Sequence, residues 1–199
     1  MERKRMLASV FALRVAGVRA SREAVARKLG VEEEDIVGPL AELAKSGHLR
    51  ASRGGLALTE KGRKAIRVVF IGGGFELIHH GHLHTVERAR ALGDALVVSV
   101  ARDSTIRKRK GREPVADERQ RVRLLEALRS VDAAILGVEG DIYETLEMVR
   151  PDVVALGYDQ YHMEREVASE ARKRGMKVRV VRLDSPSPEV KTSSLLGRY

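Results

Sequence analysis

The chain has 199 residues, enough for one large domain or for a medium domain with a small one, and it carries 37 Lys and Arg against 28 Asp and Glu. The net charge of +9 and the isoelectric point near 10.1 indicate acidic partners, such as nucleotides, phosphorylated metabolites or nucleic acid. Because the sequence has no cysteine, disulfides, thiolate catalysis and Cys-ligated zinc are excluded. No apolar run is long enough to span a membrane, and the basic N-terminus leads into an amphipathic stretch, so we expect a cytoplasmic protein with no membrane partner.

Residues 1–66 predict three helices followed by a short hairpin, with no alternation of strands and helices. Ser21 can cap the second helix, which ends at Gly30, and the third helix is expected over Glu33 to Lys45, with Pro39 tolerated near its first turn. Two short strands between His48 and Thr59 meet at a Gly-Gly turn. This order of elements resembles a winged helix-turn-helix domain.

From Arg67 onward, strands alternate with helices, which predicts an α/β domain over residues 67–199 built on a Rossmann-like sheet of five parallel strands. The strands are expected at Arg67 to Ile71, Ala95 to Val100, Ala133 to Leu136, Asp152 to Leu156 and Lys177 to Leu183. Helices are expected at His82 to Leu92, after Asp117, at Asp141 to Val149 and at Glu164 to Arg174. Asp117 and Gln120 form a capping-box pattern, and the core face of that helix is predicted to be Val122, Leu124, Leu125 and Leu128.

The segment from Gly72 to His82 joins the first strand of this domain to its first helix and has the composition of a phosphate site. Glycines at the carboxyl end of a parallel strand let backbone N–H groups approach phosphate oxygens, and the next helix adds the positive end of its dipole. The imidazoles of His79 and His82 can donate hydrogen bonds to charge that builds on phosphate oxygens in a transition state. The segment therefore indicates a site for a nucleoside triphosphate.

Other motifs fit this segment poorly. A dinucleotide fingerprint would need glycine where Leu77 stands, and no Walker Gly-Lys-Ser/Thr follows the loop. His80 and His84 could in principle bind a transition metal, but no His-Glu-x-x-His pattern or third ligand lies nearby in the sequence. We therefore expect no metal site made of protein side chains.

Two stretches, Gly73 to Glu76 and His79 to His82, resemble the signature of the cytidylyltransferase-like nucleotidyltransferase superfamily, Gly-Thr-Phe-Asp followed by His-x-Gly-His. The resemblance extends over about 130 residues. Within the superfamily the chain resembles the archaeal FAD synthases, through the stretches Val100 to Asp103, Lys110 to Pro114, Ala134 to Gly137 and Leu156 to Gln160.

This resemblance implies transfer of AMP from ATP to FMN with release of pyrophosphate, a divalent ion such as Mg²⁺ on the triphosphate, and a homodimer. Gly74 and Glu76 depart from the usual Thr and Asp of the signature. The added N-terminal domain and the absence of cysteines near the C-terminus are further departures from those synthases.

The resemblance also assigns roles to individual residues. His79 and His82 would contact the triphosphate and stabilise the α-phosphate, although helix capping alone could explain their position. Lys110, in a basic loop predicted after the second strand, would be the third catalytic residue, and the alternative is a solvated basic surface. The predicted nucleotide-binding residues are Gly73, Gly74, Phe75, His79, His82, Arg119, Gly157, Tyr158, Asp159, Thr192, Ser193 and Ser194.

The physical grounds for the later members of this set differ. Arg119 stands in a first helical turn, where carboxylates are preferred, so an anionic partner would explain it. Gly157 to Asp159 follow the fourth strand at its carboxyl end, where open α/β sheets bind ligands, and are expected in the base pocket. Thr192 to Ser194 offer hydroxyl and N–H groups at a helix start, although an ordinary N-cap would explain one of them.

Two other functions stay open. A cytidylyltransferase would use CTP and a small phosphorylated alcohol such as glycerol 3-phosphate. A nucleotide- or flavin-responsive regulator would bind DNA through residues 1–66, which hold 14 Lys and Arg against 8 Asp and Glu. Glu32 to Asp35 would repel DNA phosphates at the start of the presumed recognition helix, whereas Arg50 and Arg53 on the hairpin could contact a backbone.

Overall fold

The computed structural model describes residues 3–185 and divides the chain after Arg67 into two compact units. None of the helices within residues 3–185 is long and apolar enough to cross a membrane. Each unit has its own hydrophobic residues at zero or near-zero exposure, such as Leu7 in the first and Phe70 in the second.

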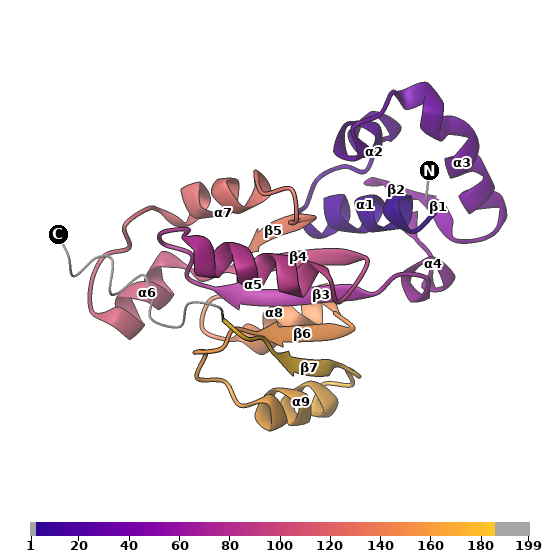
Figure 1. Cartoon of the computed structure of the whole chain (residues 1–199). Helices are drawn as coiled ribbons and strands as arrows, with labels where there is room; N and C mark the ends of the chain where they lie inside the picture. Colours follow the sequence, from indigo (N-terminus) through magenta and orange to yellow (C-terminus); the bar gives the residue numbers. More distant parts are fainter. Residues whose placement is uncertain (1–2, 186–199) are drawn as a thin grey trace. The chain divides into compact units, whose positions relative to one another are not determined.

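The N-terminal unit consists of α1 (Arg3–Val15), α2 (Arg22–Leu29), α3 (Glu33–Lys45), the antiparallel strands β1 (Leu49–Ser52) and β2 (Gly55–Leu58), and α4 (Glu60–Lys64) (Figure 1). Local chemistry sets the limits of α2. The hydroxyl of Ser21 accepts the backbone N–H of Ala24 at 3.1 Å, and Gly30 ends the helix with a φ of 71°. The buried residues of the three longer helices include Met6, Leu7, Val10, Val25, Ile36, Leu40 and Leu43.

Two details of this unit differ from the sequence-based expectation. Pro39 lies in the interior of α3 rather than near its first turn, between the buried residues Ile36 and Leu40. Residues 60–64 form the short helix α4, capped by Thr59, whose hydroxyl accepts the N–H of Gly62 at 3.1 Å. Whether the unit works as a winged helix stays a prediction.

The second unit is built on one sheet in which five strands lie in the order β5-β4-β3-β6-β7, and every neighbouring pair is parallel. The five-stranded parallel sheet predicted from the sequence is therefore confirmed. The strands are β3 (Val68–Gly73), β4 (Ala95–Val100), β5 (Ala133–Leu136), β6 (Val153–Leu156) and β7 (Arg179–Arg182).

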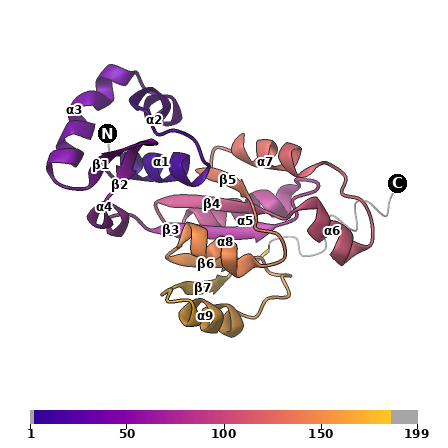
Figure 2. The ribbon, with the colours of Figure 1, turned by 180° about the vertical axis from the view of Figure 1, so that it is seen from behind.

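Helices flank the sheet on both faces. Figures 1 and 2 show α5 (His80–Arg90) and α7 (Glu118–Glu126) on one face and α8 (Ile142–Val149) on the other. The helix α9 (Glu164–Lys173) packs along β7, and α6 (Asp103–Lys110) follows β4. The chain runs from β3 outward to one edge and then returns to the other side of β3. This reversal leaves a crevice at the carboxyl ends of β3 and β6, the usual place for a ligand in such sheets.

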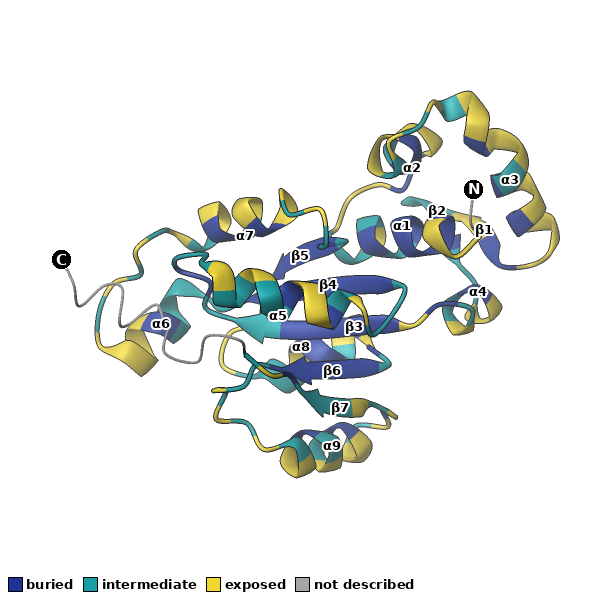
Figure 3. Cartoon of the chain, in the orientation of Figure 1, coloured by how far each residue is buried: buried dark blue, intermediate teal, exposed yellow. Residues whose placement is uncertain are grey.

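The core of this unit lies around the two central strands. Every residue of β4 is buried, as are the first four residues of β3, and Figure 3 shows β4 and this first part of β3 in dark blue. Strands that are covered on both faces are expected to consist of continuous runs of apolar residues, and the sequences of β3 and β4 are largely of this kind. The core cluster includes Val69, Ile71, Phe75, Val86, Leu96, Val98, Leu125, Val153 and Leu183.

Three expectations for this unit were wrong in detail. The helix after β3 begins at His80 rather than His82, with His79 as its N-cap residue. The basic segment that ends at Lys110 is not a loop but the last turn of α6. On α7, Leu124 is 51% exposed, whereas Arg121 is fully buried four residues before the buried Leu125.

Candidate active site

The loop between β3 and α5 is bent sharply by Phe75, which has a φ of 48° in the left-handed region. The Phe75 ring turns back over Gly73, where a Cβ atom would lie 2.9 Å from it. The same ring lies 5.3 Å from the ring of His82, measured between centroids. Glycine at position 73 therefore lets Phe75 pack inward and support His82.

His79 and His82 form a pair at the start of α5, with their rings in contact and tilted by 39°. Their ring centroids are 4.0 Å apart, and the Nδ1 atom of each is buried with no hydrogen-bond partner among the residues described. Burial lowers the pKa of His82 to about 4, and burial is also the main cause that lowers the pKa of His79. Both rings are thus neutral near pH 7, and each has a buried ring nitrogen without a hydrogen-bond partner among the described residues.

Glu76 anchors the basic end of α6 to this loop. Its carboxylate is buried and accepts hydrogen bonds from Lys110 and from Arg112, whose Nη1 and Nη2 atoms lie 2.7 and 3.2 Å from it. Burial alone would raise the pKa of Glu76, but the bonds from Arg112 and Lys110 outweigh it and lower the pKa overall. The ionised Glu76 therefore holds Lys110 at the site.

A cavity of about 330 Å³ opens at the carboxyl ends of the central strands. Of the residues predicted for the site, those that line it are Gly73, Gly74, Lys110 and Asp159. Phe75, His79 and His82 are not part of this lining, and the charge of Asp159, which does line the cavity, counteracts the lowering of the pKa of both histidines.

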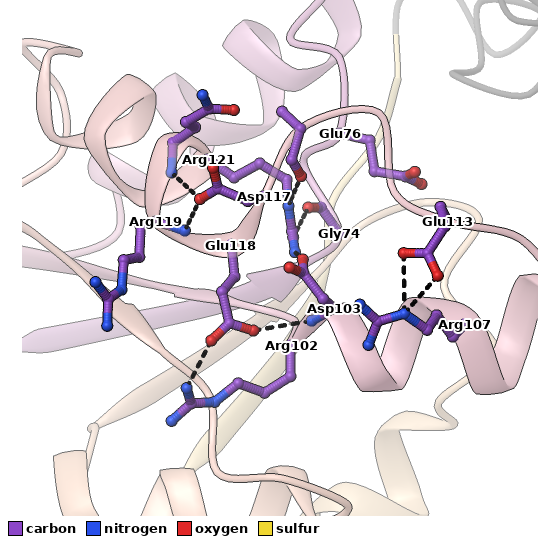
Figure 4. A network of polar contacts seen from close by, with 12 residues as sticks. Gly74, Glu76, Arg102, Asp103, Arg107, Glu113, Asp117, Glu118, Arg119 and Arg121 are labelled. Atoms are coloured by element: carbon purple, nitrogen blue, oxygen red, sulfur yellow. Dashed lines mark hydrogen bonds and ion pairs between the residues drawn. The ribbon is translucent and has the colours of Figure 1, made fainter.

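The structure does not bring every predicted site residue to the cavity. Gly157 and Tyr158 precede the lining residue Asp159 but are not part of the lining themselves. Arg119 is exposed on α7, and its side chain extends away from Gly74 in Figure 4. Its role as a phosphate ligand stays a prediction, and Thr192, Ser193 and Ser194 lie outside the described residues.

Arg121 is a site residue that the sequence analysis missed. Its fully buried guanidinium lies between the carbonyl of Gly74, at 2.6 Å, and the carboxylate of Asp103, at 2.6 Å (Figure 4). It also donates to the carbonyl of Ala116 at 3.0 Å. The side chain of Arg121 thus links the loop after β3, the start of α6 and the segment before α7.

Arg102 and Glu118 reinforce this junction. Arg102 donates through Nε to the carbonyl of Gly137 at 2.8 Å and through Nη1 to Glu118 at 2.9 Å. Glu118 also accepts the backbone N–H of Asp103 at 2.9 Å. The carboxyl ends of β4 and β5 are thereby fixed relative to α6 and α7.

The loop after β6 is tied to its neighbours by side chains that donate hydrogen bonds to backbone carbonyls. Gln160 donates through Nε2 to the carbonyl of Gly72 at 2.5 Å. Arg182 on β7 donates to the carbonyls of Gly157 and Gln160 at 2.9 and 2.8 Å. The backbone of residues 157–160 is therefore held against the end of β3.

Aromatic groups line the cavity on the side of this loop. The guanidinium of Arg109 lies 4.6 Å from the ring centroid of Tyr161, and the rings of Tyr161 and His162 are 4.0 Å apart. All three residues line the cavity, and Tyr161 is 62% exposed. Together they place two aromatic rings and a guanidinium on this side of the cavity, groups against which a planar ring could pack.

The site described above matches a known family. Residues 70–198, which include the glycine loop, the histidine pair and α6, match the model of the cytidylyltransferase-like family. The chain belongs to this family, and its second unit is a nucleotidyltransferase domain.

Within this family, the chain is similar to FAD synthases. The FAD synthase of Aciduliprofundum boonei is 50% identical over 115 residues, which cover 58% of this chain and 76% of that protein. The FAD synthase of Thermococcus kodakarensis is 41% identical over 142 residues, or 70% of this chain and 95% of that protein. A Thermoplasma volcanium crystal structure, described as a lipopolysaccharide core biosynthesis protein, is 44% identical with a TM-score of 0.58, over 60% of this chain and 98% of that one.

Proposed function

We propose that this chain is an FAD synthase that transfers AMP from ATP to FMN. The observation that carries the proposal is the pair of neutral histidines, each with a buried and unpaired Nδ1 atom, on the loop whose glycines line a cavity at the carboxyl ends of the strands, in a chain 41–50% identical to FAD synthases such as those of T. kodakarensis and A. boonei. Dimer formation and DNA binding stay predictions from the sequence.

The reaction needs no covalent intermediate with the protein. A phosphate oxygen of FMN attacks the α-phosphorus of ATP, the bond from that phosphorus to the bridging oxygen of the β-phosphate breaks, and pyrophosphate leaves with that oxygen. The protein must hold the two substrates in line and stabilise the charge that builds on the phosphate oxygens.

The histidine pair fits the second task. A neutral imidazole can donate one N–H to a phosphate oxygen, and a phosphate that reached the buried Nδ1 atoms of His79 and His82 would supply the partner that they lack within residues 3–185. Lys110 lines the cavity and brings a positive charge to it. Because Glu76 holds Lys110 and Arg112 together, the triphosphate would meet a cation already in place rather than one that must be ordered on binding.

We propose that Mg²⁺ enters with the triphosphate. Within the described part of the chain, no cluster of three or more His, Asp or Glu side chains could hold a metal ion. Mg²⁺ commonly keeps several waters and binds substrate phosphates, so phosphate oxygens would supply most of its ligands here. The ion would neutralise part of the phosphate charge, and the residues of this chain would supply the rest.

The lining of the cavity favours FMN over glycerol 3-phosphate as the acceptor. Arg109, Tyr161 and His162 present aromatic and planar cationic surfaces, which suit the flat ring system of a flavin. A small alcohol phosphate would leave this surface without a partner. We therefore keep the cytidylyltransferase as the second candidate.

The direct test is a two-by-two assay of the full chain with Mg²⁺, in which ATP or CTP is paired with FMN or glycerol 3-phosphate. Pyrophosphate release and product mass are both measured. We expect FAD from ATP and FMN, and a drop in kcat of about 10²- to 10³-fold in a His82→Ala variant. The matched control is His80→Ala, which changes the neighbouring, exposed histidine and should keep kcat near that of the unmodified chain.

Activity only with CTP and glycerol 3-phosphate would replace the proposal with the cytidylyltransferase. A chain that binds ATP but forms no product with any pair would point instead to the regulator. A thermal melt of each variant shows whether a loss of activity reflects unfolding.

A further inference from the structure

Three arginines converge on a second cavity, which lies within the N-terminal unit and plays no part in the proposed reaction. This cavity has a volume of about 360 Å³ and is lined by Arg14, Gly17, Val18, Arg19, Arg53 and Gly54. Arg14 stands at the end of α1, Arg19 in the segment before α2, and Arg53 at the turn between β1 and β2.

The backbone fixes these three positions relative to one another. Ala20 donates its N–H to the carbonyl of Gly54 at 3.0 Å and accepts the N–H of Leu56 at 2.8 Å. The segment that carries Arg19 is thereby hydrogen-bonded to the hairpin that carries Arg53. Gly55 is required there, since its φ is 89° and a Cβ atom would lie 2.5 Å from the carbonyl oxygen of Ala20.

Glycine also makes room for the third cation. The guanidinium of Arg14 lies over Gly54, where a Cβ atom would come within 1.7 Å of its Nη1 atom. A side chain at position 54 would therefore require the end of the flexible Arg14 side chain to shift. The backbone arrangement itself depends on Gly55.

The positive charge gathered here is not offset by acidic side chains. None of the guanidinium groups of Arg14, Arg19 and Arg53 forms an ion pair within residues 3–185. Arg14 lies in the last turn of α1, where it compensates the helix dipole, which amounts to about half a charge. Most of the charge of the cluster is left for a ligand.

We propose that the Arg14–Arg19–Arg53 cavity binds a phosphate group. Guanidinium groups bind phosphate through paired hydrogen bonds in a fixed geometry, and a phosphate offers enough acceptor oxygens for several of them. The phosphate belongs either to a nucleic acid backbone or to a free phosphorylated molecule. The start of α3 is a poorer place for either, because its first turn carries Glu33, Glu34 and Asp35.

The experiment follows the arginine Nε–Hε signals of the full-length protein by NMR during titration with a 20-base-pair DNA duplex and, separately, with inorganic phosphate. A triple variant, Arg14→Gln, Arg19→Gln and Arg53→Gln, assigns the three signals. The matched control variant is Arg5→Gln, Lys28→Gln and Lys45→Gln, which removes the same charge from exposed positions of the same unit. Duplex affinity is also measured by fluorescence anisotropy at several salt concentrations.

If the backbone of a nucleic acid is the source, the duplex shifts all three signals. The triple variant then binds it at least tenfold more weakly than the control variant does, with a salt slope lower by about 2 to 3. If a free phosphate is the source, inorganic phosphate shifts the three signals and the duplex does not. The proposal is overturned if neither titrant moves these signals, or if the control variant loses as much affinity as the triple variant does.

Discussion

His82 lies against Phe75 and His79, and burial lowers its pKa from 6.5 to about 4. In the unfolded chain this histidine takes up a proton near pH 6.5, whereas in the folded chain it does so only near pH 4. Between these values the unfolded state holds the extra proton, so the free energy of unfolding falls as the pH falls. We expect His82 to contribute up to about 3 kcal/mol above pH 6.5, lost progressively toward pH 4.

Urea unfolding at a series of pH values measures this contribution. Subtracting the curve of a His82→Gln variant isolates it from the carboxylates that titrate in the same range. Leu83→Gln, at the adjacent exposed position, removes no titratable group and should leave the pH dependence unchanged. Parallel curves for the His82→Gln variant and the unmodified chain would show that His82 titrates near its ordinary value, and its role as a neutral donor would then fail.

Arg121 is a buried cation whose partners come from three separate segments of the chain. An Arg121→Gln variant would leave the carboxylate of Asp103 and the carbonyl of Gly74 without the donors that satisfy them. We expect the variant to lose about 3 to 5 kcal/mol of unfolding free energy. Arg123→Gln, on an exposed position of the same helix, should change it by less than about 0.5 kcal/mol.

Urea unfolding of the two variants decides the point, and equal stabilities would show that Arg121 is not the link between these segments. An Asp103→Asn variant adds a second measure. If Arg121 and Asp103 act as a pair, the loss in the double variant is smaller than the sum of the two single losses.

The histidine pair could be predicted from the sequence because the glycines and histidines typical of a phosphate site all lie within eleven consecutive residues, from Gly72 to His82. Arg121 could not, because an arginine on a helix is usually exposed. Its burial depends on Gly74 and Asp103, which lie 47 and 18 residues away in the sequence. The one available signal was its spacing of four residues from Leu125 on the core face of α7.

At the scale of elements, the glycine loop after β3 makes a prediction that separates two neighbouring glycines. A methyl group at Gly73 would meet the Phe75 ring at 2.9 Å, whereas one at Gly74 would find only the Cδ1 atom of Ile106, at 4.0 Å. We expect Gly73→Ala to cost about 1 to 3 kcal/mol of unfolding free energy through displacement of Phe75. Gly74→Ala should be neutral within about 0.5 kcal/mol.

Thermal and urea unfolding of the two alanine variants measures the difference directly. Because Phe75 supports His82, the Gly73→Ala variant should also shift the NMR signal of the His82 ring, and Gly74→Ala should not. Equal stability of the two variants would mean that the loop tolerates a side chain at either position, contrary to the packing of Phe75.

The parallel strands were predicted well, whereas α6 was mistaken for a loop, and the reason is physical. The strands are buried on both faces and so consist of continuous apolar residues. The helix α6 buries only Ile106 and ends in four consecutive basic residues. Its sequence therefore lacks the apolar periodicity from which a helix is predicted. Its start is instead stabilised by Glu118 and Arg121, which contact Asp103 from the next helix.

At the scale of the whole molecule, the matched stretches of the relatives fix where the transferase lies. The match covers 95% of the T. kodakarensis FAD synthase and 98% of the T. volcanium chain, and the family match begins at residue 70. Those relatives therefore have no room for a counterpart of the N-terminal unit. The described residues of the histidine pair, the cavity and the Arg121 network all belong to the second unit.

We accordingly expect a chain that begins at Val68 to keep kcat and KM for FAD formation within about twofold of the full chain, well under the tenfold that 1.4 kcal/mol of transition-state binding would represent. Cleavage of the full chain at a protease site inserted after Arg67 gives the same test if the shorter chain does not fold when expressed alone. A fragment that melts cooperatively but has lost FAD formation would show that the N-terminal unit contributes to catalysis. Retained activity, together with loss of duplex or phosphate binding at the Arg14–Arg19–Arg53 cavity, would assign the two activities to separate units of one chain.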